Sequence, residues 1–227
     1  MLAVELHTHS VASHDGRDPV DLLLEQAAAI ELDAIAITDH DTLEGSKKAI
    51  ELGPQYGLIV IPGLEVSTAA GHVIGLGVTE LIPKGLSYGE TLDRIRSQGG
   101  IAIIPHAFQH SRHGVAPNVT RDELAAADAI EVYNSRLITG RANRKAEAFA
   151  RARNLPTTAG SDAHISEMVG QAVTYVDADP AAGYEGILEA IAAGDTIVEG
   201  RRTPWHISFR QAAGGMKRRM IRRFRKL

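Results

Sequence analysis

Three histidines and an aspartate stand close together in VELHTHSVASHDG, residues 4–16. His7 and His9 lie two residues apart at the end of an apolar run. In an extended strand, side chains at positions i and i+2 point to the same side, so these two imidazoles should project together, with Thr8 turned away. Two neighbouring imidazoles repel when both are protonated, whereas a shared cation between them removes that repulsion. The segment therefore predicts a metal site, and a polar strand end with incidental histidines is the alternative.

Further residues of metal-ligand type follow four other apolar runs. They stand at or just after the ends of AIAIT, VIPGL, AIIP and TTAGS, and they are Asp39, His40, Asp41, Glu65, His106, Asp162 and His164. Aspartate and histidine are common in loops, so no single position is informative. The same placement at five strand ends is difficult to obtain by chance. Because the carboxyl ends of parallel strands in a barrel meet at one face, the sequence predicts one shared site there.

The elements that must position these residues alternate between short apolar runs and helical patterns. Strands are expected at 3–6, 34–38, 58–61, 72–76, 102–104, 129–132, 157–159 and 196–198. Helices are expected at 19–30, with Asp18 as N-cap, and at 43–52, 88–98, 122–126, 140–153 and 184–193. Such alternation is typical of a mainly parallel sheet, and about seven units with strands apolar on both faces favour a closed barrel.

Composition restricts the chemistry and the location. The chain has no cysteine, so a metal would be held by His, Asp, Glu and water. No apolar run approaches the roughly 18 residues that span a bilayer, and no signal peptide is visible, so a cytoplasmic protein is expected. Ten of the 24 basic side chains and none of the 28 acidic ones lie after Glu199, which leaves the preceding residues with a net charge of −14. We expect one domain over residues 1–200 and a basic amphipathic tail over 201–227.

The motifs ELHTHS, SHDG, AITDHDT, PGLEVS, PHA and GSDAH together resemble the polymerase and histidinol phosphatase (PHP) family of metal-dependent phosphoesterases. The resemblance covers residues 4–176, with the motifs in the family's order and spacing. It implies a distorted (β/α)7 barrel with its metal site at the carboxyl ends of the strands. It also implies two or three divalent metals, commonly Mn, Fe or Zn, and hydrolysis of phosphate esters by a metal-activated water.

The resemblance also assigns ligands. His7, His9, Glu65 and Asp162 would bind one metal, and Glu65 would bridge to a second that His106 also holds. Asp15, His40 and His164 would hold a third. Glu65, Asp162 and His40 are the expected catalytic residues. Asp39 and Asp41 would orient imidazoles, although Asp41 serves equally well as the N-cap of the next helix.

One position departs from the family pattern. Many members carry a further histidine between Glu65 and His106, and here only His72 is available, at the start of its predicted strand rather than its end. His72 would complete the second metal, or it would line the pocket while water or substrate completes that metal. Arg112, Arg136 and His110 follow strand ends and are candidates to receive substrate phosphate, with a solvated loop as the alternative for the segment after His106.

Substrate and partners are less constrained. Nucleotides or oligonucleotide ends, as for an exonuclease, are the expected substrates, with a sugar phosphate or a non-catalytic metal- and nucleic-acid-binding domain as alternatives. In the tail, apolar residues at three- and four-residue spacing form a stripe among arginines, as on an amphipathic helix: Ala213, Met216, Met220, Phe224 and Leu227. This tail would dock on the acidic body, bind nucleic acid through its phosphates, or lie on an anionic membrane surface.

Overall fold

A computed structural model describes residues 1–136, 139–204 and 207. The stripe predicted in the tail, and with it the three alternatives for the tail's role, lies outside the described residues. No helix in the described part of the chain combines the length and apolarity needed to cross a membrane.

The described strands form two five-stranded sheets. The first has the order β10 (Thr196–Gly200), β9 (Ala172–Val176), β1 (Leu2–Glu5), β2 (Ala34–Ala36) and β3 (Ile59–Ile61). The second has the order β4 (Gly63–Ser67), β5 (His72–Leu76), β6 (Ile101–Ile104), β7 (Ala129–Asn134) and β8 (Thr157–Gly160). β4 and β9 were not among the predicted strands, because a proline separates β4 from β3 and polar residues interrupt the pattern of β9.

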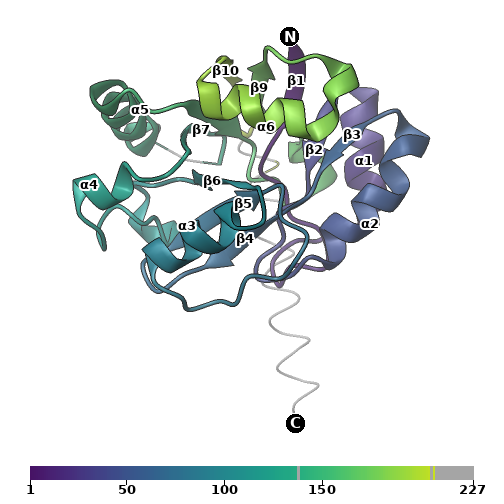
Figure 1. The fold of residues 1–227 in the computed structure, drawn as a ribbon. Helices are drawn as coiled ribbons and strands as arrows, with labels where there is room; N and C mark the ends of the chain where they lie inside the picture. Colours follow the sequence, from purple (N-terminus) through teal and green to yellow (C-terminus); the bar gives the residue numbers. More distant parts are fainter. Residues whose placement is uncertain (137–138, 205–206, 208–227) are drawn as a thin grey trace.

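Six helices surround the sheets in the described residues: α1 (Val20–Ala29), α2 (Glu44–Leu52), α3 (Tyr88–Arg96), α4 (Arg121–Leu124), α5 (Arg141–Arg153) and α6 (Gly183–Ala193). Figure 1 shows them on the outside of the molecule, with α1 and α2 on one side and α4 and α5 on the other. Capping boxes start α3 at Ser87 and α4 at Thr120. The expected N-cap of α1 is off by one position, because Pro19 occupies it and Asp18 instead accepts a hydrogen bond from the Ser166 N–H.

The α/β class is confirmed, whereas no closed barrel is found in the described part of the chain. The ladders remain within two sheets, which only two isolated parallel bridges join, Thr8 with Ala163 and His40 with Glu65. The expected parallel order also fails at two places. β5 is antiparallel to β4 and β6, and β9 is antiparallel to β1 and β10.

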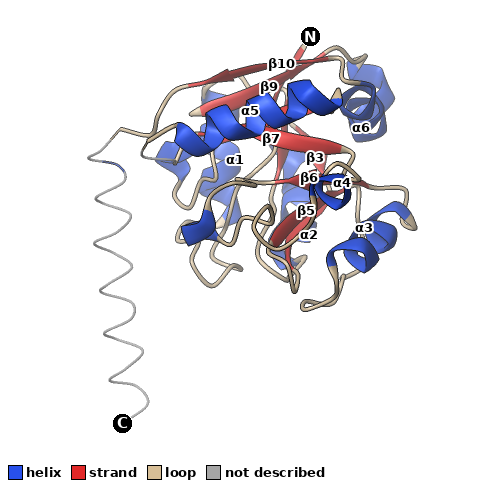
Figure 2. Ribbon diagram, turned by 90° about the vertical axis from the view of Figure 1, so that its left-hand side faces the viewer, coloured by secondary structure: helices blue, strands red, loops and turns tan. Residues whose placement is uncertain are grey.

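An apolar cluster fills the space between the two sheets. Val4 on β1 and Leu6 just after it pack with Ile74 and Ile103 of the second sheet. Ile187 on α6 belongs to the same cluster. Figure 2 shows α6 at the end of the molecule where the N-terminus lies. The polar residues that follow the carboxyl ends of β1, β2, β6 and β8 are therefore gathered at the other end of this core.

Candidate metal centre

Glu65 lies at the centre of the residues gathered there. Its side chain is buried on β4, and five imidazole nitrogens approach its two oxygens. The distances to Oε2 are 3.3 Å from His7 Nε2, 3.2 Å from His9 Nε2 and 3.4 Å from His40 Nδ1; those to Oε1 are 2.8 Å from His72 Nδ1 and 3.3 Å from His106 Nε2. Five imidazoles from four separate chain segments thus converge on one carboxylate.

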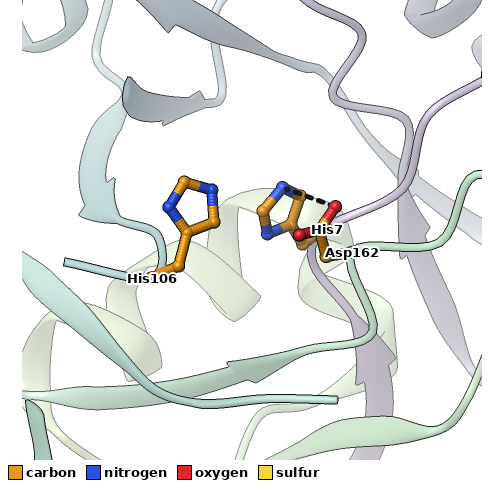
Figure 3. Close-up of side chains that lie close together, drawn as sticks. All are labelled: His7, His106 and Asp162. Atoms are coloured by element: carbon orange, nitrogen blue, oxygen red, sulfur yellow. Dashed lines mark ion pairs between the residues drawn. The ribbon is translucent and has the colours of Figure 1, made fainter. Parts of the chain in front are cut away.

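Asp162 provides a second buried carboxylate next to the first histidines. Its Oδ1 lies 4.0 Å from His7 Nε2, 3.7 Å from His9 Nε2 and 3.3 Å from His164 Nδ1. Figure 3 shows the His7 ring between His106 and Asp162, although these residues come from three different strand ends. His7 and His9 do project to one side, with ring centroids 5.1 Å apart, while the Thr8 hydroxyl donates to the Ala36 carbonyl on β2.

Asp15 marks the outer part of the cluster. Its Oδ2 is 2.7 Å from His164 Nε2 and 3.6 Å from His40 Nε2, and about a third of its side chain is exposed. The ligand atoms of five residue triads lie within 4.8 Å of one another. These triads are His7–His106–Asp162, His7–His9–Glu65, His9–Asp15–His164, His14–Asp15–His40 and His40–Glu65–His72. The structure therefore brings together every residue that the resemblance assigned as a ligand.

The electrostatics of this cluster are dominated by its carboxylates. Burial raises the pKa of Glu65, but the surrounding histidines outweigh it and hold that pKa well below its usual range. Burial alone lowers the pKa of His40, yet Glu65 and Asp15 raise it to about 9. His9 is enclosed among other imidazoles, and its burial lowers its pKa. The carboxylates are thus held ionised at a place where cations are favoured.

Unpaired buried atoms test whether this donor set fits a metal. Within the described residues, the buried side-chain atoms that lack a hydrogen-bond partner are both ring nitrogens of His9, His40 Nδ1, His72 Nδ1, His106 Nδ1, Glu65 Oε1 and Ser161 Oγ. Leaving such groups unpaired costs about 1–3 kcal/mol each, so their concentration around Glu65 calls for a further partner. Imidazole nitrogen and carboxylate oxygen, without sulfur, are ligands that suit Mn²⁺, Fe²⁺ and Zn²⁺. The residues present fit a divalent metal centre.

His72 reaches the site from a direction that the sequence did not indicate. It begins β5, and a parallel strand would have placed it at the wrong end. Because β5 is antiparallel, His72 pairs with Ser67 at the end of β4, and its Nδ1 comes to 2.8 Å from Glu65. Its ring is also 5.7 Å from that of His106, so the two imidazoles lie close together beside Glu65.

Asp39 and Asp41 accept hydrogen bonds that position loops around the cluster. Asp39 accepts hydrogen bonds from the N–H and the hydroxyl of Ser10, at 2.6 and 2.7 Å, and so holds the segment that follows His9. Asp41 accepts from the Ser67 N–H at 2.7 Å, which fastens the loop after β2 to β4. Its predicted role as the N-cap of α2 is wrong, since Leu43 occupies that position.

A cavity of about 580 Å³ opens onto the cluster. Arg112 and Arg136 line it, and their Nη1 atoms lie 3.2 and 2.7 Å from the two oxygens of Asp162. His110 is exposed and is not among the residues that line the cavity, whereas His113, three positions further, does line it and has its ring 5.1 Å from that of His72. A tight turn at His110–Arg112, followed by His113 at a φ of 56°, separates the two histidines. The spacing of residues in the sequence did not indicate this turn.

Glu131 on β7 is the residue that the sequence interpretation missed. Its buried carboxylate forms hydrogen bonds with His7 Nδ1 at 2.9 Å, the His106 N–H at 2.8 Å and Asn134 Nδ2 at 2.9 Å. A signal was available in AIEVYN, because a glutamate in the middle of an otherwise apolar strand must be buried and must therefore find partners.

Replacing Gly160 by alanine should weaken metal binding. A Cβ at this position on β8 would lie 2.4 Å from Glu131 Oε1 and 2.5 Å from His7 Cβ, so the His7–Glu131 pair would have to move. We expect a loss of roughly tenfold or more in Mn²⁺ affinity, measured by calorimetric titration of the metal-free protein. Gly89→Ala is the matched control, because nothing lies within 4 Å of its Cβ, and it should leave the affinity unchanged. Equal affinities in both variants would contradict this account of β8.

A buried group of imidazoles and carboxylates at the strand ends of an α/β fold gives the class of protein: an α/β protein whose site could hold divalent metals. Comparisons with known proteins agree. The PHP-associated family matches residues 140–196. The uncharacterized protein MJ1587 of Methanocaldococcus jannaschii is 33% identical over 144 residues, which cover 59% of this chain and 82% of that protein.

Two named enzymes also match over shorter regions. The phosphoribosyl 1,2-cyclic phosphate 1,2-diphosphodiesterase of Eggerthella lenta is 41% identical over 97 residues, or 40% of this chain and 37% of that enzyme. The 3′,5′-nucleoside bisphosphate phosphatase of Chromobacterium violaceum is 31% identical over 109 residues, or 44% of this chain and 38% of that enzyme. The matches thus cover well under half of either enzyme.

A solved structure supports the fold. A two-domain protein from Bacteroides vulgatus, which contains a predicted PHP-like metal-dependent phosphoesterase, superposes with a TM-score of 0.74 at 21% identity. The match covers 88% of this chain and 65% of that one. The chain belongs to the PHP family of metal-dependent phosphoesterases, a family of phosphoric ester hydrolases, which confirms the resemblance found in its motifs.

Proposed function

We propose that this protein binds two or three divalent ions, Mn, Fe or Zn, and hydrolyses phosphate esters of nucleotides or oligonucleotide ends. The observation that carries the proposal is the carboxylate of Glu65, buried among five imidazoles whose ring nitrogens include several without a hydrogen-bond partner. Neither an apolar core nor a solvated surface accounts for that arrangement.

The ligands divide into three groups around the two buried carboxylates. His7, His9, Glu65 and Asp162 would hold the first ion. Glu65 and His106 would hold the second, and the 2.8 Å approach of His72 to Glu65 supports His72 as its further ligand. Asp15, His40 and His164 would hold the third, supported by the contacts of Asp15 with both histidines.

Divalent metals at these ligands would supply Lewis acidity and would lower the pKa of a bound water toward neutrality. The remaining work falls to residues of the chain. Glu65 would hold two ligand groups at a fixed separation, and Asp162 would anchor the first ion. Arg112 and Arg136 line the cavity, where their guanidinium groups would pair with the non-bridging oxygens of the substrate phosphate.

The cavity favours a substrate with a phosphate at one end and a larger neutral part at the other. The segment 67–71 also lines the cavity, and it is a turn of Ser, Thr, Ala and Gly residues with no charged side chain. The two named relatives act, by their names, on a phosphoribosyl cyclic phosphate and a nucleoside bisphosphate. A sugar phosphatase is the second candidate, since the phosphate end would be the same. A non-catalytic domain would be expected to lose ligands, and no assigned ligand is missing here.

The proposal also covers the limits of the domain and the arrangement of its strands as a barrel. Residues 1–200 would form the phosphoesterase domain, and the basic residues 201–227 would follow it as a separate segment. The two isolated bridges support a distorted seven-stranded barrel in which β3 and β4 act as one broken strand between β2 and β5.

Metal removal tests this function. Protein stripped with a chelator should lose hydrolysis of nucleoside bisphosphates, phosphorylated oligonucleotides or sugar phosphates, measured as phosphate release. Mn²⁺, Fe²⁺ and Zn²⁺, added separately, should restore it to different extents. The Asp162→Ala variant should stay inactive with every metal. Activity that survives both chelation and Asp162→Ala would show that the hydrolysis does not come from this site.

A further inference from the structure

The buried carboxylate of Glu131 meets three hydrogen-bond donors from three parts of the chain. Oε2 accepts from the His106 backbone N–H at 2.8 Å and from Asn134 Nδ2 at 2.9 Å, while Oε1 lies 2.9 Å from His7 Nδ1. Glu131 is 2% exposed and His7 is fully buried, so water does not compete for these contacts.

An ionised carboxylate can only accept hydrogen bonds, so it requires a proton on His7 Nδ1. In neutral His7 the lone pair then resides on Nε2, the nitrogen that lies 3.3 Å from Glu65 Oε2 and 4.0 Å from Asp162 Oδ1. That nitrogen faces the candidate ligands, and a metal bound there would replace its hydrogen bond to Glu65.

Neighbouring residues pack closely around the Glu131 and His7 side chains and hold them in this arrangement. On one side, β8 packs so closely that a Cβ at Gly160 would overlap both Glu131 and His7. On the other side, Asn134 Nδ2 also reaches Asp162 Oδ2 at 3.3 Å, and so links Glu131 to the second buried carboxylate. The His106 N–H that Glu131 accepts belongs to a residue with a φ of 34°, a strained backbone that needs such support.

We propose that Glu131 is a positioning residue that fixes the tautomer of His7. By also holding the His106 backbone, it sets the placement of His7 and His106, two candidate ligands that follow different strands, relative to each other. This inference rests on the proposed metal centre and deepens it. Glu131 itself contacts neither the metal nor the substrate. It acts through His7, where a proton held on Nδ1 directs metal binding to Nε2, and through the backbone of His106.

The isosteric variant Glu131→Gln tests the tautomer directly. The Oε2 position receives two donors, so the single amide oxygen of glutamine is drawn there and its NH₂ group faces His7 Nδ1. His7 Nδ1 must then accept, and its proton moves to Nε2, where it blocks ligation. The shape of the side chain is unchanged, so packing of β7 is preserved.

The experiment titrates Co²⁺ into the metal-free full-length chain and follows the visible absorption of the bound ion. Glu131→Gln should weaken Co²⁺ binding by about 10–100-fold and change the absorption envelope, because an imidazole leaves the coordination sphere. The exposed Glu189→Gln on α6 is the matched control and should match the unmodified protein in both respects. In a His7→Ala background, Glu131→Gln should add less than about twofold, since the residue through which it acts is absent.

Three results would overturn the inference. One is a Co²⁺ affinity and spectrum in Glu131→Gln equal to those of the unmodified protein. Another is a loss in the His7→Ala background as large as in the native one, which would assign Glu131 a purely structural role. The third is an unmodified protein that binds no Co²⁺, which would remove the proposed metal centre as well. Thermal melts check that each variant folds. If Glu131→Gln does not fold, Gly160→Ala displaces the same pair without changing charge, and its loss of affinity should likewise vanish in the His7→Ala background.

Discussion

Replacing Glu65 by glutamine should lower the turnover of a phosphate ester by about 10³-fold, the equivalent of roughly 4 kcal/mol of transition-state stabilisation. Five imidazoles approach this one carboxylate, so no other residue of the described chain serves as many of the candidate ligands. An amide has one oxygen and no charge. It can neither bridge two cations nor offset their repulsion.

The measurement pairs steady-state kinetics with elemental analysis of metal content. Glu65→Gln should retain less metal than the unmodified protein after gel filtration, and the loss should appear in kcat rather than in KM alone. Glu51→Gln, at an exposed position in α2, should change neither quantity. Near-normal kcat in Glu65→Gln would remove Glu65 from the centre of the chemistry.

Metal binding should also raise the thermal stability of the protein by a large margin. Filling a site at about 100 times its Kd contributes roughly 2.7 kcal/mol, and for a chain of this size each kcal/mol shifts Tm by about 2–4 °C. Saturation with Mn²⁺ should therefore raise Tm by roughly 5–10 °C. The physical source is the set of buried nitrogen and oxygen atoms that, among the described residues, have no hydrogen-bond partner within the protein.

Differential scanning calorimetry measures this shift, with Mg²⁺ as the comparison ion because it prefers oxygen ligands over imidazole. The shift should be small with Mg²⁺ and small for Glu65→Gln with Mn²⁺. An equal Mn²⁺ response in the variant would mean that the ion binds elsewhere, for example at the acidic surface.

The ligands could be predicted from the sequence because their positions follow from a local rule. His7, His40, His106 and Asp162 each come directly after an apolar run, and the structure gathers all of them around Glu65 and its neighbours. The rule depends only on where a strand ends, so it survives errors in topology. The α/β class was predictable for the same reason, since it follows from the alternation of short apolar runs and helical patterns.

What depended on the direction of a strand could not be predicted. A short apolar run has the same pattern whether it lies parallel or antiparallel to its neighbours. The strand at 72–76, with His72 at its start, was predicted, but its antiparallel direction, which brings that start to the site, was not. Glu131 was missed for a different reason. Its polar side chain interrupts β7 and was passed over, although its burial among donors is what gives it a role.

Side chains in loops were the least predictable. Arg112 and Arg136 do line the cavity, but His110 is exposed and does not line it, whereas His113 does. Asp39 and Asp41 bond to Ser10 and to the Ser67 backbone, contacts that depend on how the loops after β1 and β2 fold together. Spacing carries no information about such contacts between loops.

Anomalous X-ray diffraction from crystals grown with Mn²⁺ tests the central claim most directly, because it locates the ions without assuming any reaction. The account predicts at least two strong peaks, each about 2.0–2.3 Å from a Glu65 oxygen or from the nitrogens of His7, His9 and His106, with Glu65 touching both. The absence of peaks at saturating Mn²⁺, or peaks that Glu65 does not touch, would contradict it.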